Sequence, residues 1–226
     1  MTESRLILIP ALNAEPYLGA VVEGCGKVSD VPVLVVDDGS SDATGRVARD
    51  AGAEVIRHEV NLGKGAALKT GFQVALERDC AAVVTIDADG QHLPSEIPRF
   101  FEEWERTSAD LIIGSRSHLF DGMVRRRRAA NQFSAWAIST VSGVKLTDSQ
   151  SGFRLYSRRL IDEVTIRTNG FEAESEVIVR AGRGGFRIES ITIALEFVDG
   201  LSTSHYRPVA DTARIVWTVA RTRFVG

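Results

Sequence analysis

The chain has 226 residues, of which 44% are hydrophobic and 25% are charged, a balance typical of a globular protein with a core of ordinary size. Its formal net charge of -3 at neutral pH argues against a nucleic-acid-binding protein. The length suits one large domain, and we expect residues 1–226 to form it.

Strands alternate with helices along the first half of the chain. Short runs predict buried strands at Leu6–Ile9, Val31–Val36, Glu54–Arg57, Ala82–Ile86 and Leu111–Gly114. Helical spacing and capping residues predict helices at Tyr17–Val28, Ala66–Arg78 and Pro94–Arg106, and another that Ser41 and Asp42 cap and that runs to Ala51. This order indicates an α/β fold with a mostly parallel, Rossmann-like sheet and helices on both faces.

The pattern changes after residue 116. Four arginines at positions 125–128 precede a predicted helix at Ala129–Ser142, and a polar stretch follows at Thr147–Tyr156. Further on we expect a helix at Phe171–Gly182, a late strand at Ile188–Phe197 and an amphipathic helix at Asp211–Arg223.

Polar residues follow four of the predicted strands: Pro10–Asn13, Asp37–Asp38, Asp87–Asp89 and Gly114–Arg116. Ligands of parallel sheets bind at the carboxyl ends of the strands, so we expect one site there. Asp87 and Asp89 are costly to bury together unless a cation neutralises them. Their hard oxygen ligands suit Mg²⁺ or Mn²⁺, with phosphate oxygens completing the site. The alternative is a turn in which both residues only cap Gly90 or the next helix.

Two further motifs are candidates for ligand contact. The neighbouring carboxylates of Asp37 and Asp38 are able to accept hydrogen bonds from a base or a ribose, whereas Ser41 and Asp42 are better explained as a helix cap. Asn61–Gly65 lacks the spacing of a P-loop, so we reject that motif. Lys64 remains a candidate phosphate contact.

These motifs, in order, resemble the inverting family 2 glycosyltransferases of GT-A fold. The resemblance rests on Pro10–Asn13, Val35–Thr44, Asn61–Gly65, Asp87–Pro94, Gly114–Arg116 and Ser151–Arg154, and it covers nearly the whole chain. The run from Asp87 to His92 is most similar to the dolichol-phosphate mannose synthase branch, which transfers sugars to polyprenyl phosphates.

The resemblance implies a role for each motif. Residues 1–116 would form the nucleotide-sugar-binding half and residues 117–226 the acceptor-side half. Asp87, Asp89 and Gln91 would hold Mg²⁺ or Mn²⁺ and the diphosphate of GDP-mannose or UDP-glucose. The remaining donor contacts would be Pro10, Leu12, Asn13, Val36, Asp37, Asp38, Lys64, Ala88 and Arg116. The acceptor contacts would be Arg128, Asn131, Ser134, Ser151 and Arg154.

The chain departs from the branch at two places. Ala14 stands where an acidic residue is usual and Glu15 comes one position later, so we expect a base contact to be lost or shifted. Gly200 and His205 stand where the branch has Arg and Lys, and Arg207 is our candidate to supply that charge to the donor.

We expect Asp89, Arg116 and Glu174 to act in catalysis. Asp89 and Arg116 would stabilise the diphosphate leaving group, and Glu174 would act as a base or orient the acceptor. The three carboxylates of Glu172, Glu174 and Glu176 are spaced by two and cannot all share one helix face, so we regard Glu172 and Glu176 as a solvated face. A soluble or protein hydroxyl acceptor, a nucleotidyltransferase and a non-catalytic nucleotide-binding homologue are the alternatives.

The sequence also carries expectations about location. Cys25 and Cys80 lie in no metal or redox motif, so we expect two buried thiols and a cytoplasmic chain. The arginines at 125–128, followed by Phe133 and Trp136, predict peripheral contact with an anionic membrane at its inner face. Either a homodimer or an integral membrane partner is compatible with this surface.

Overall fold

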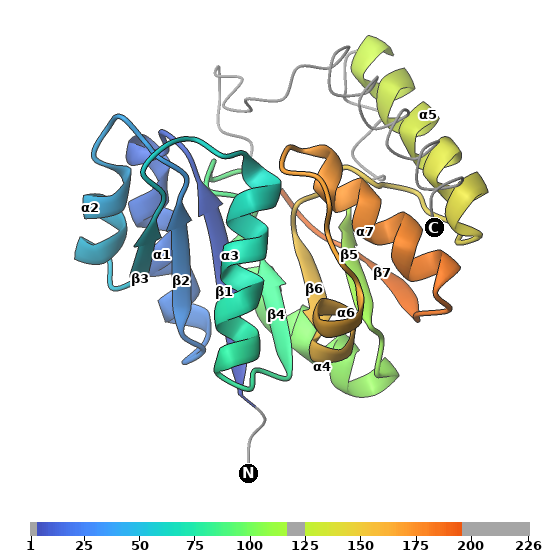
Figure 1. The fold of residues 1–226 in the computed structure, drawn as a ribbon, viewed down its shortest axis with the longest axis horizontal. Helices are drawn as coiled ribbons and strands as arrows, with labels where there is room; N and C mark the ends of the chain where they lie inside the picture. Colours follow the sequence, from blue (N-terminus) through green and yellow to red (C-terminus); the bar gives the residue numbers. More distant parts are fainter. Residues whose placement is uncertain (1–3, 117–124, 196–226) are drawn as a thin grey trace.

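One sheet organises the part of the chain that the computed structural model describes, residues 4–116 and 125–195, with the backbone alone for 125–130. Within these residues the sheet has seven strands in the order β3-β2-β1-β4-β6-β5-β7 (Figure 1). The strands are β1 (Arg5–Ala11), β2 (Val33–Asp37), β3 (Glu54–Arg57), β4 (Ala82–Thr85), β5 (Leu111–Ser115), β6 (Arg154–Ser157) and β7 (Ile188–Thr192). All neighbours pair in parallel except those of β6, which confirms the mostly parallel α/β sheet.

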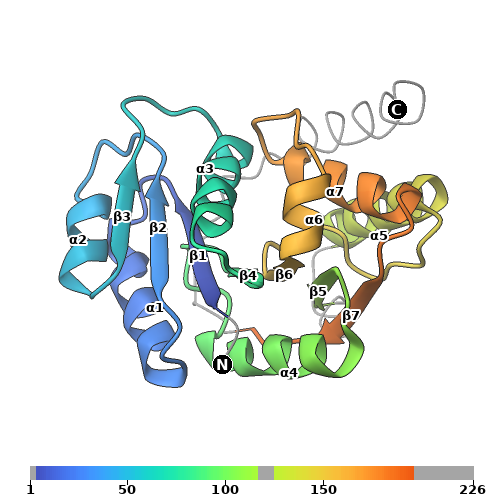
Figure 2. The same ribbon diagram turned by 60° about the horizontal axis from the view of Figure 1, so that its bottom comes forward.

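Helices cover both faces of the sheet (Figure 2). One face carries α1 (Glu15–Val28), α2 (Thr44–Asp50) and α4 (Ile97–Thr107), the last preceded by a short 3-10 turn at Pro94–Glu96. The other face carries α3 (Lys64–Glu77), α5 (Arg125–Ser142), α6 (Arg158–Glu163) and α7 (Glu172–Arg183). Alternate residues of β1 explain the two layers, since Leu6 and Leu8 join one apolar cluster and Ile7 and Ile9 the other.

The polar stretch at Thr147–Tyr156 contains an element that the sequence did not predict. Its end forms β6, which inserts antiparallel between β4 and β5 and pairs Thr85 with Arg154. Residues 149–153 therefore lie beside the carboxyl end of β4. This insertion brings a segment of the second half of the chain to the strand ends of the first half.

Other boundaries also differ from the sequence-based expectations. Helix α5 begins at Arg125 rather than at Ala129, and α6 was not expected. The late strand ends at Thr192, and the predicted helix at Asp211–Arg223 lies outside the described residues. Cys25 and Cys80 are buried free thiols, as expected. None of the helices in the described ranges combines the length and the hydropathy that crossing a membrane requires.

Candidate functional site

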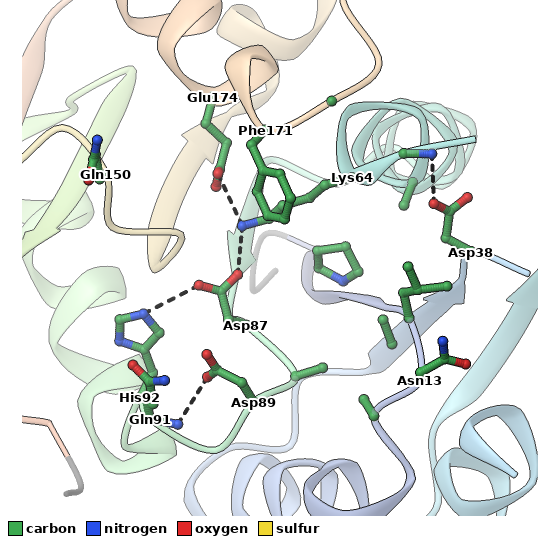
Figure 3. Close-up of a pocket in the computed structure, with 18 of the residues that line it drawn as sticks. Asn13, Asp38, Lys64, Asp87, Asp89, Gln91, His92, Gln150, Phe171 and Glu174 are labelled. Atoms are coloured by element: carbon green, nitrogen blue, oxygen red, sulfur yellow. Dashed lines mark hydrogen bonds and ion pairs between the residues drawn. The ribbon is translucent and has the colours of Figure 1, made fainter. Parts of the chain in front are cut away.

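A cavity of about 420 Å³ opens at the carboxyl ends of β1, β4 and β5 (Figure 3). Residues from both halves of the chain line it. They are Pro10, Ala11, Leu12, Asn13, Ala14, Tyr17, Asp38, Asn61, Gly63, Lys64, Ala67, Asp87, Ala88, Asp89, Gln91, His92, Arg116, Asn131, Ser149, Gln150, Gly170, Phe171, Glu174, Ser175 and Leu195. Twelve of the residues that the sequence proposed for the site therefore share one cavity: Pro10, Leu12, Asn13, Asp38, Lys64, Asp87, Ala88, Asp89, Gln91, Arg116, Asn131 and Glu174.

The carboxylate of Asp87 lies at the centre of the cavity wall, just beyond β4. Its Oδ1 accepts a hydrogen bond of 2.7 Å from Nζ of Lys64, and its Oδ2 lies 3.5 Å from Nε2 of His92. Burial would raise the pKa of Asp87, but the charge of Lys64 and the contact with His92 outweigh it and hold the pKa well below its ordinary value. Asp87 is therefore ionised at neutral pH.

Asp89 lies beside Asp87 and has fewer partners. Its Oδ1 accepts the backbone N–H of Gln91 at 3.1 Å, which fixes the turn after the strand. Burial and the neighbouring charge of Asp87 together raise the pKa of Asp89 above its ordinary value. The pair is thus electrostatically unfavourable as it stands, and a bound cation would relieve it.

Lys64 is the cation nearest to this pair. It is the first residue of α3, and Gly63 before it has a φ of 100°, a conformation that favours glycine. Its Nζ bridges Asp87 and Oε2 of Glu174, the latter at 3.0 Å. Burial would lower the pKa of Lys64, but the two carboxylates outweigh it and raise the pKa, so the ammonium stays charged.

Asp38 directly follows β2 and lines the other end of the cavity. Its carboxylate accepts hydrogen bonds from Nδ1 of His58 at 2.7 Å and from the backbone N–H groups of Leu62 and Gly63 at 3.0 and 2.7 Å. His58 in turn contacts Oγ1 of Thr70 at 2.9 Å. Asp38 therefore holds the 61–63 loop against the cavity. His58 was not predicted, although it directly follows β3 and so also lies at the carboxyl end of a strand.

Arg116 extends from the end of β5 and is held by a residue that the sequence analysis also missed. Nε and Nη2 of its guanidinium donate to Asp148 at 2.8 and 3.2 Å, and its backbone N–H donates to the same carboxylate. Burial would raise the pKa of Asp148, but Arg116 outweighs it and lowers the pKa. This two-point pair fixes the orientation of the guanidinium at the cavity wall.

Three buried polar atoms of cavity-lining residues have no hydrogen-bond partner. They are Nδ1 of His92, Oγ of Ser149 and Oε1 of Glu174. Buried polar groups are usually satisfied, so atoms of this kind at a cavity wall indicate contacts that a ligand or water completes. Ser149 was not among the expected contacts.

Several expected contacts lie elsewhere. Val36 and Asp37 are fully buried away from the cavity, and the carboxylate of Asp37 is used by the backbone N–H of Ser40 and by Arg57. Ser134 and Ser151 are also buried and do not line the cavity. None of these four residues lines the cavity, and the expectation that they contact the ligand stays a prediction.

Arg154 is the clearest correction. We expected an anion contact, but its side chain is fully buried and donates to the backbone carbonyls of Ser149, Ser151 and Glu174 at 2.9, 2.7 and 2.8 Å. The guanidinium therefore ties the segment before β6 to the first turn of α7. Its role is to fix the segment before β6.

Two acidic residues near these motifs have other partners. Glu15 does not line the cavity, and its carboxylate accepts the backbone N–H of Ala43 at 3.0 Å. Glu176 is buried rather than solvated, and it binds Thr168 and Arg180. The side chain of Arg128, and Gly200, His205 and Arg207 entirely, lie outside the described residues, so the expectations for them stay predictions.

The site fits a divalent cation only in part. Among the residues with described side chains, no group of three or more His, Cys, Asp or Glu has the geometry of a complete metal site. Asp87 and Asp89 offer hard oxygen ligands, which is the donor set that Mg²⁺ and Mn²⁺ use when phosphate oxygens and water supply the rest. The residues therefore fit a metal that binds together with a phosphorylated ligand.

Comparison with known proteins gives consistent matches. A family model described as glycosyl transferase family 2 matches residues 6–165. Undecaprenyl-phosphate mannosyltransferase of Micrococcus luteus is 35% identical, with 83% of this chain and 82% of that protein covered. Polyprenol monophosphomannose synthase of Mycolicibacterium smegmatis is 32% identical, with 85% and 77% covered.

Solved structures match in fold. Glucosyl-3-phosphoglycerate synthase from Mycobacterium tuberculosis, in complex with phosphoglyceric acid, superposes with a TM-score of 0.78 at 20% identity. The match covers 100% of this chain and 81% of that one. The same enzyme in complex with Mn²⁺, UDP-glucose and phosphoglyceric acid gives a TM-score of 0.75 at 20% identity, with 100% and 81% covered.

Proposed function

The chain belongs to glycosyl transferase family 2 and is a glycosyltransferase of GT-A fold, and from this premise we propose that it transfers a hexose to a polyprenyl phosphate. The donor would be a nucleotide-sugar, and the reaction would be metal-dependent and inverting. One observation carries this proposal: a single cavity holds the strand-end carboxylate pair together with Arg116, Asn131 and Ser149. The names of two relatives, which cover more than four fifths of this chain, support the acceptor class.

The donor would lie along the strand ends. Asn13 and Asp38 line the end of the cavity where a base and ribose would bind, next to the apolar side chains of Pro10 and Leu12. Asp87 and Asp89, with Gln91, would hold Mg²⁺ or Mn²⁺. When bound, the ion would supply positive charge to the diphosphate as it leaves. Arg116, oriented by its pair with Asp148, would add a second positive charge at the leaving group.

The environment of Glu174 favours a phosphate acceptor over a hydroxyl. Attack by a hydroxyl needs a general base, whereas a lipid phosphate is already an anion at neutral pH. One oxygen of Glu174 is paired with the ammonium of Lys64 at 3.0 Å, so that oxygen is already occupied and does not face a substrate hydroxyl. Glu174 would therefore orient the acceptor or Lys64 rather than remove a proton.

A pair of matched assays tests this proposal. Purified protein is incubated with Mn²⁺ or Mg²⁺, a short-chain polyprenyl phosphate and either GDP-mannose or UDP-glucose, and the glycolipid is detected by mass spectrometry. We expect one donor to give a polyprenyl-phosphate hexose, and we expect Glu174→Gln to retain most of that activity. Transfer only to soluble hydroxyl acceptors, abolished by Glu174→Gln, would refute the proposed acceptor.

The outer surface of α5 supports a membrane-associated acceptor. Phe133 and Trp136 are 49% and 64% exposed, and their rings lie 5.8 Å apart. The helix starts with the four arginines of positions 125–128. Aromatic rings beside basic residues suit the interface of an anionic bilayer. We expect co-sedimentation with phosphatidylglycerol vesicles at low salt, weakened by replacing both rings with serine. Equal sedimentation of the variant and the unchanged protein would contradict a role for this face.

A further inference from the structure

The ammonium of Lys64 is bound to the carboxylate of Asp87, which a metal ion at this site would need as a ligand. It lies 2.7 Å from Oδ1 of Asp87 and 3.0 Å from Oε2 of Glu174 (Figure 3). The ring of Phe171 covers it, with the centroid 5.9 Å from Nζ, and the side chain is only 15% exposed. Lys64 is thus an enclosed counter-ion of Asp87 and not a surface lysine.

The backbone around Lys64 holds it in this position. The N–H groups of Gly65 and Ala66, in the first turn of α3, donate to the carbonyl of Asn169 at 2.6 and 3.2 Å. Gly65 has no room for a side chain there, because a Cβ would lie 2.8 Å from the backbone carbon of Asn169. The loop before α7 therefore fixes the backbone at the start of α3, from which the side chain of Lys64 extends to Asp87 and Glu174.

That loop has its own anchor in α7. Glu176 accepts hydrogen bonds from the backbone N–H groups of Arg167 and Thr168 at 3.1 and 3.0 Å. Burial would raise the pKa of Glu176, but Arg180 and Thr168 outweigh it and lower the pKa, so it remains a charged acceptor. Lys64 therefore joins the two halves of the chain, because it pairs with Asp87 of residues 1–116 and with Glu174 of residues 117–226.

The charges around Lys64 indicate what it does. Three carboxyl groups, those of Asp87, Asp89 and Glu174, line the cavity around the single ammonium of Lys64, which pairs with two of them. A divalent ion that arrives alone would be attracted by the remaining charge. However, it would have to displace the ammonium from Asp87 and would be repelled by it at short range. An ion that arrives with a diphosphate brings negative charge that takes over as the partner of the ammonium.

We propose that Lys64 is a counter-cation that competes with the divalent ion for Asp87 and so makes metal binding depend on the nucleoside diphosphate. The inference rests on the metal–diphosphate site of the proposed function. Lys64 acts here as a positioning residue of the donor site. It would keep Asp87 neutralised between turnovers and would then face the diphosphate while remaining paired with Glu174.

A binding titration tests the competition without any catalysis. Free Mn²⁺ is followed by electron paramagnetic resonance as it is added to the unchanged protein, to Lys64→Met and to Lys27→Met, with and without GDP or UDP. Lys27 is an exposed residue of α1, so its variant makes the same charge change far from the cavity. Lys64→Met should bind Mn²⁺ alone at least tenfold more tightly than the other two proteins. The tightening of Mn²⁺ binding by the nucleotide should shrink by a similar factor.

A double variant separates displacement from a general charge effect. Lys64→Met/Glu174→Gln removes one positive and one negative charge, so the local net charge is that of the unchanged protein. We expect this variant also to bind Mn²⁺ alone more tightly, because Asp87 is free of the ammonium. Mn²⁺ affinity of the double variant equal to that of the unchanged protein would overturn the inference, whatever the single variant does.

The outcome is distinguishable from failure of the proposed function. If the unchanged protein binds Mn²⁺ with nucleotide and Lys64→Met behaves as expected, the inference stands even if no polyprenyl phosphate is glycosylated. If sugar transfer occurs but Lys64→Met leaves Mn²⁺ binding unchanged, the inference alone is wrong.

Discussion

Gly152 carries a sharp steric prediction about the centre of the site. A Cβ built on Gly152 would lie 2.4 Å from Oδ2 and 2.5 Å from Oδ1 of Asp87, whereas ordinary van der Waals contact begins at 3.4 Å. Gly152→Ala should therefore push the carboxylate by about 1 Å, away from its contacts with Lys64 and His92. A misplacement of this size costs roughly 100-fold in rate, or about 2.7 kcal/mol of transition-state stabilisation.

The variant should remain folded, so that the loss is one of function. Overpacking costs about 1–3 kcal/mol, which is less than the stability of an ordinary domain. Gly26→Ala is the matched control, because nothing lies within 4 Å of its Cβ position and alanine in a helix is favoured by about 0.5–1 kcal/mol. Steady-state kinetics and circular dichroism are the assays. A folded Gly152→Ala protein with unchanged kcat/KM would refute the argument.

Three further substitutions follow from the charges of the site. Asp148→Asn leaves Arg116 unpaired and should lower the free energy of unfolding by about 3 kcal/mol. The pKa of Asp148 is lowered on folding, so the difference in unfolding free energy between the two proteins should be full above the ordinary pKa and fade as the pH falls below 4. Thermal denaturation at a series of pH values measures this, and a difference independent of pH would contradict it. Burial and the charge of Asp87 raise the pKa of Asp89, so its carboxylate is unfavourable in the folded protein. Asp89→Asn should therefore raise the Tm at pH 7 by about 2–4 °C while Mn²⁺ binding with nucleotide is lost. A lower Tm would be evidence against this repulsion. Arg116→Lys keeps the charge but not the two-point contact, and kcat/KM should fall roughly tenfold or more; full activity would exclude an oriented guanidinium.

The parallel part of the sheet could be predicted because its strands are short apolar runs that end in polar residues. The same reasoning located Asp38, Asp87 and Arg116 at one edge, since the carboxyl ends of parallel strands meet there. It failed for Asp37, which differs from Asp38 only in pointing to the other side of the strand, where it binds Ser40 and Arg57.

The second half of the chain was harder to predict because polar residues form its buried structure. Strand β6 follows a segment that Arg154 holds through the carbonyls of Ser149 and Ser151 and ties to α7 through that of Glu174, and no periodicity in the sequence predicts such contacts. Pairs between distant residues were missed for a related reason. Asp148 and Arg116 are 32 positions apart, and only the antiparallel insertion of β6 brings their segments together.

The carboxylate pair is the most direct point at which to test the account. Asp87→Asn/Asp89→Asn should bind the nucleoside diphosphate with Mn²⁺ at least 100-fold more weakly in isothermal titration calorimetry, because both hard oxygen ligands of the ion lose their charge. Sugar transfer by the same variant should fall to background. Donor affinity and turnover equal to those of the unchanged protein would contradict the central claim that these two aspartates hold the metal and the diphosphate.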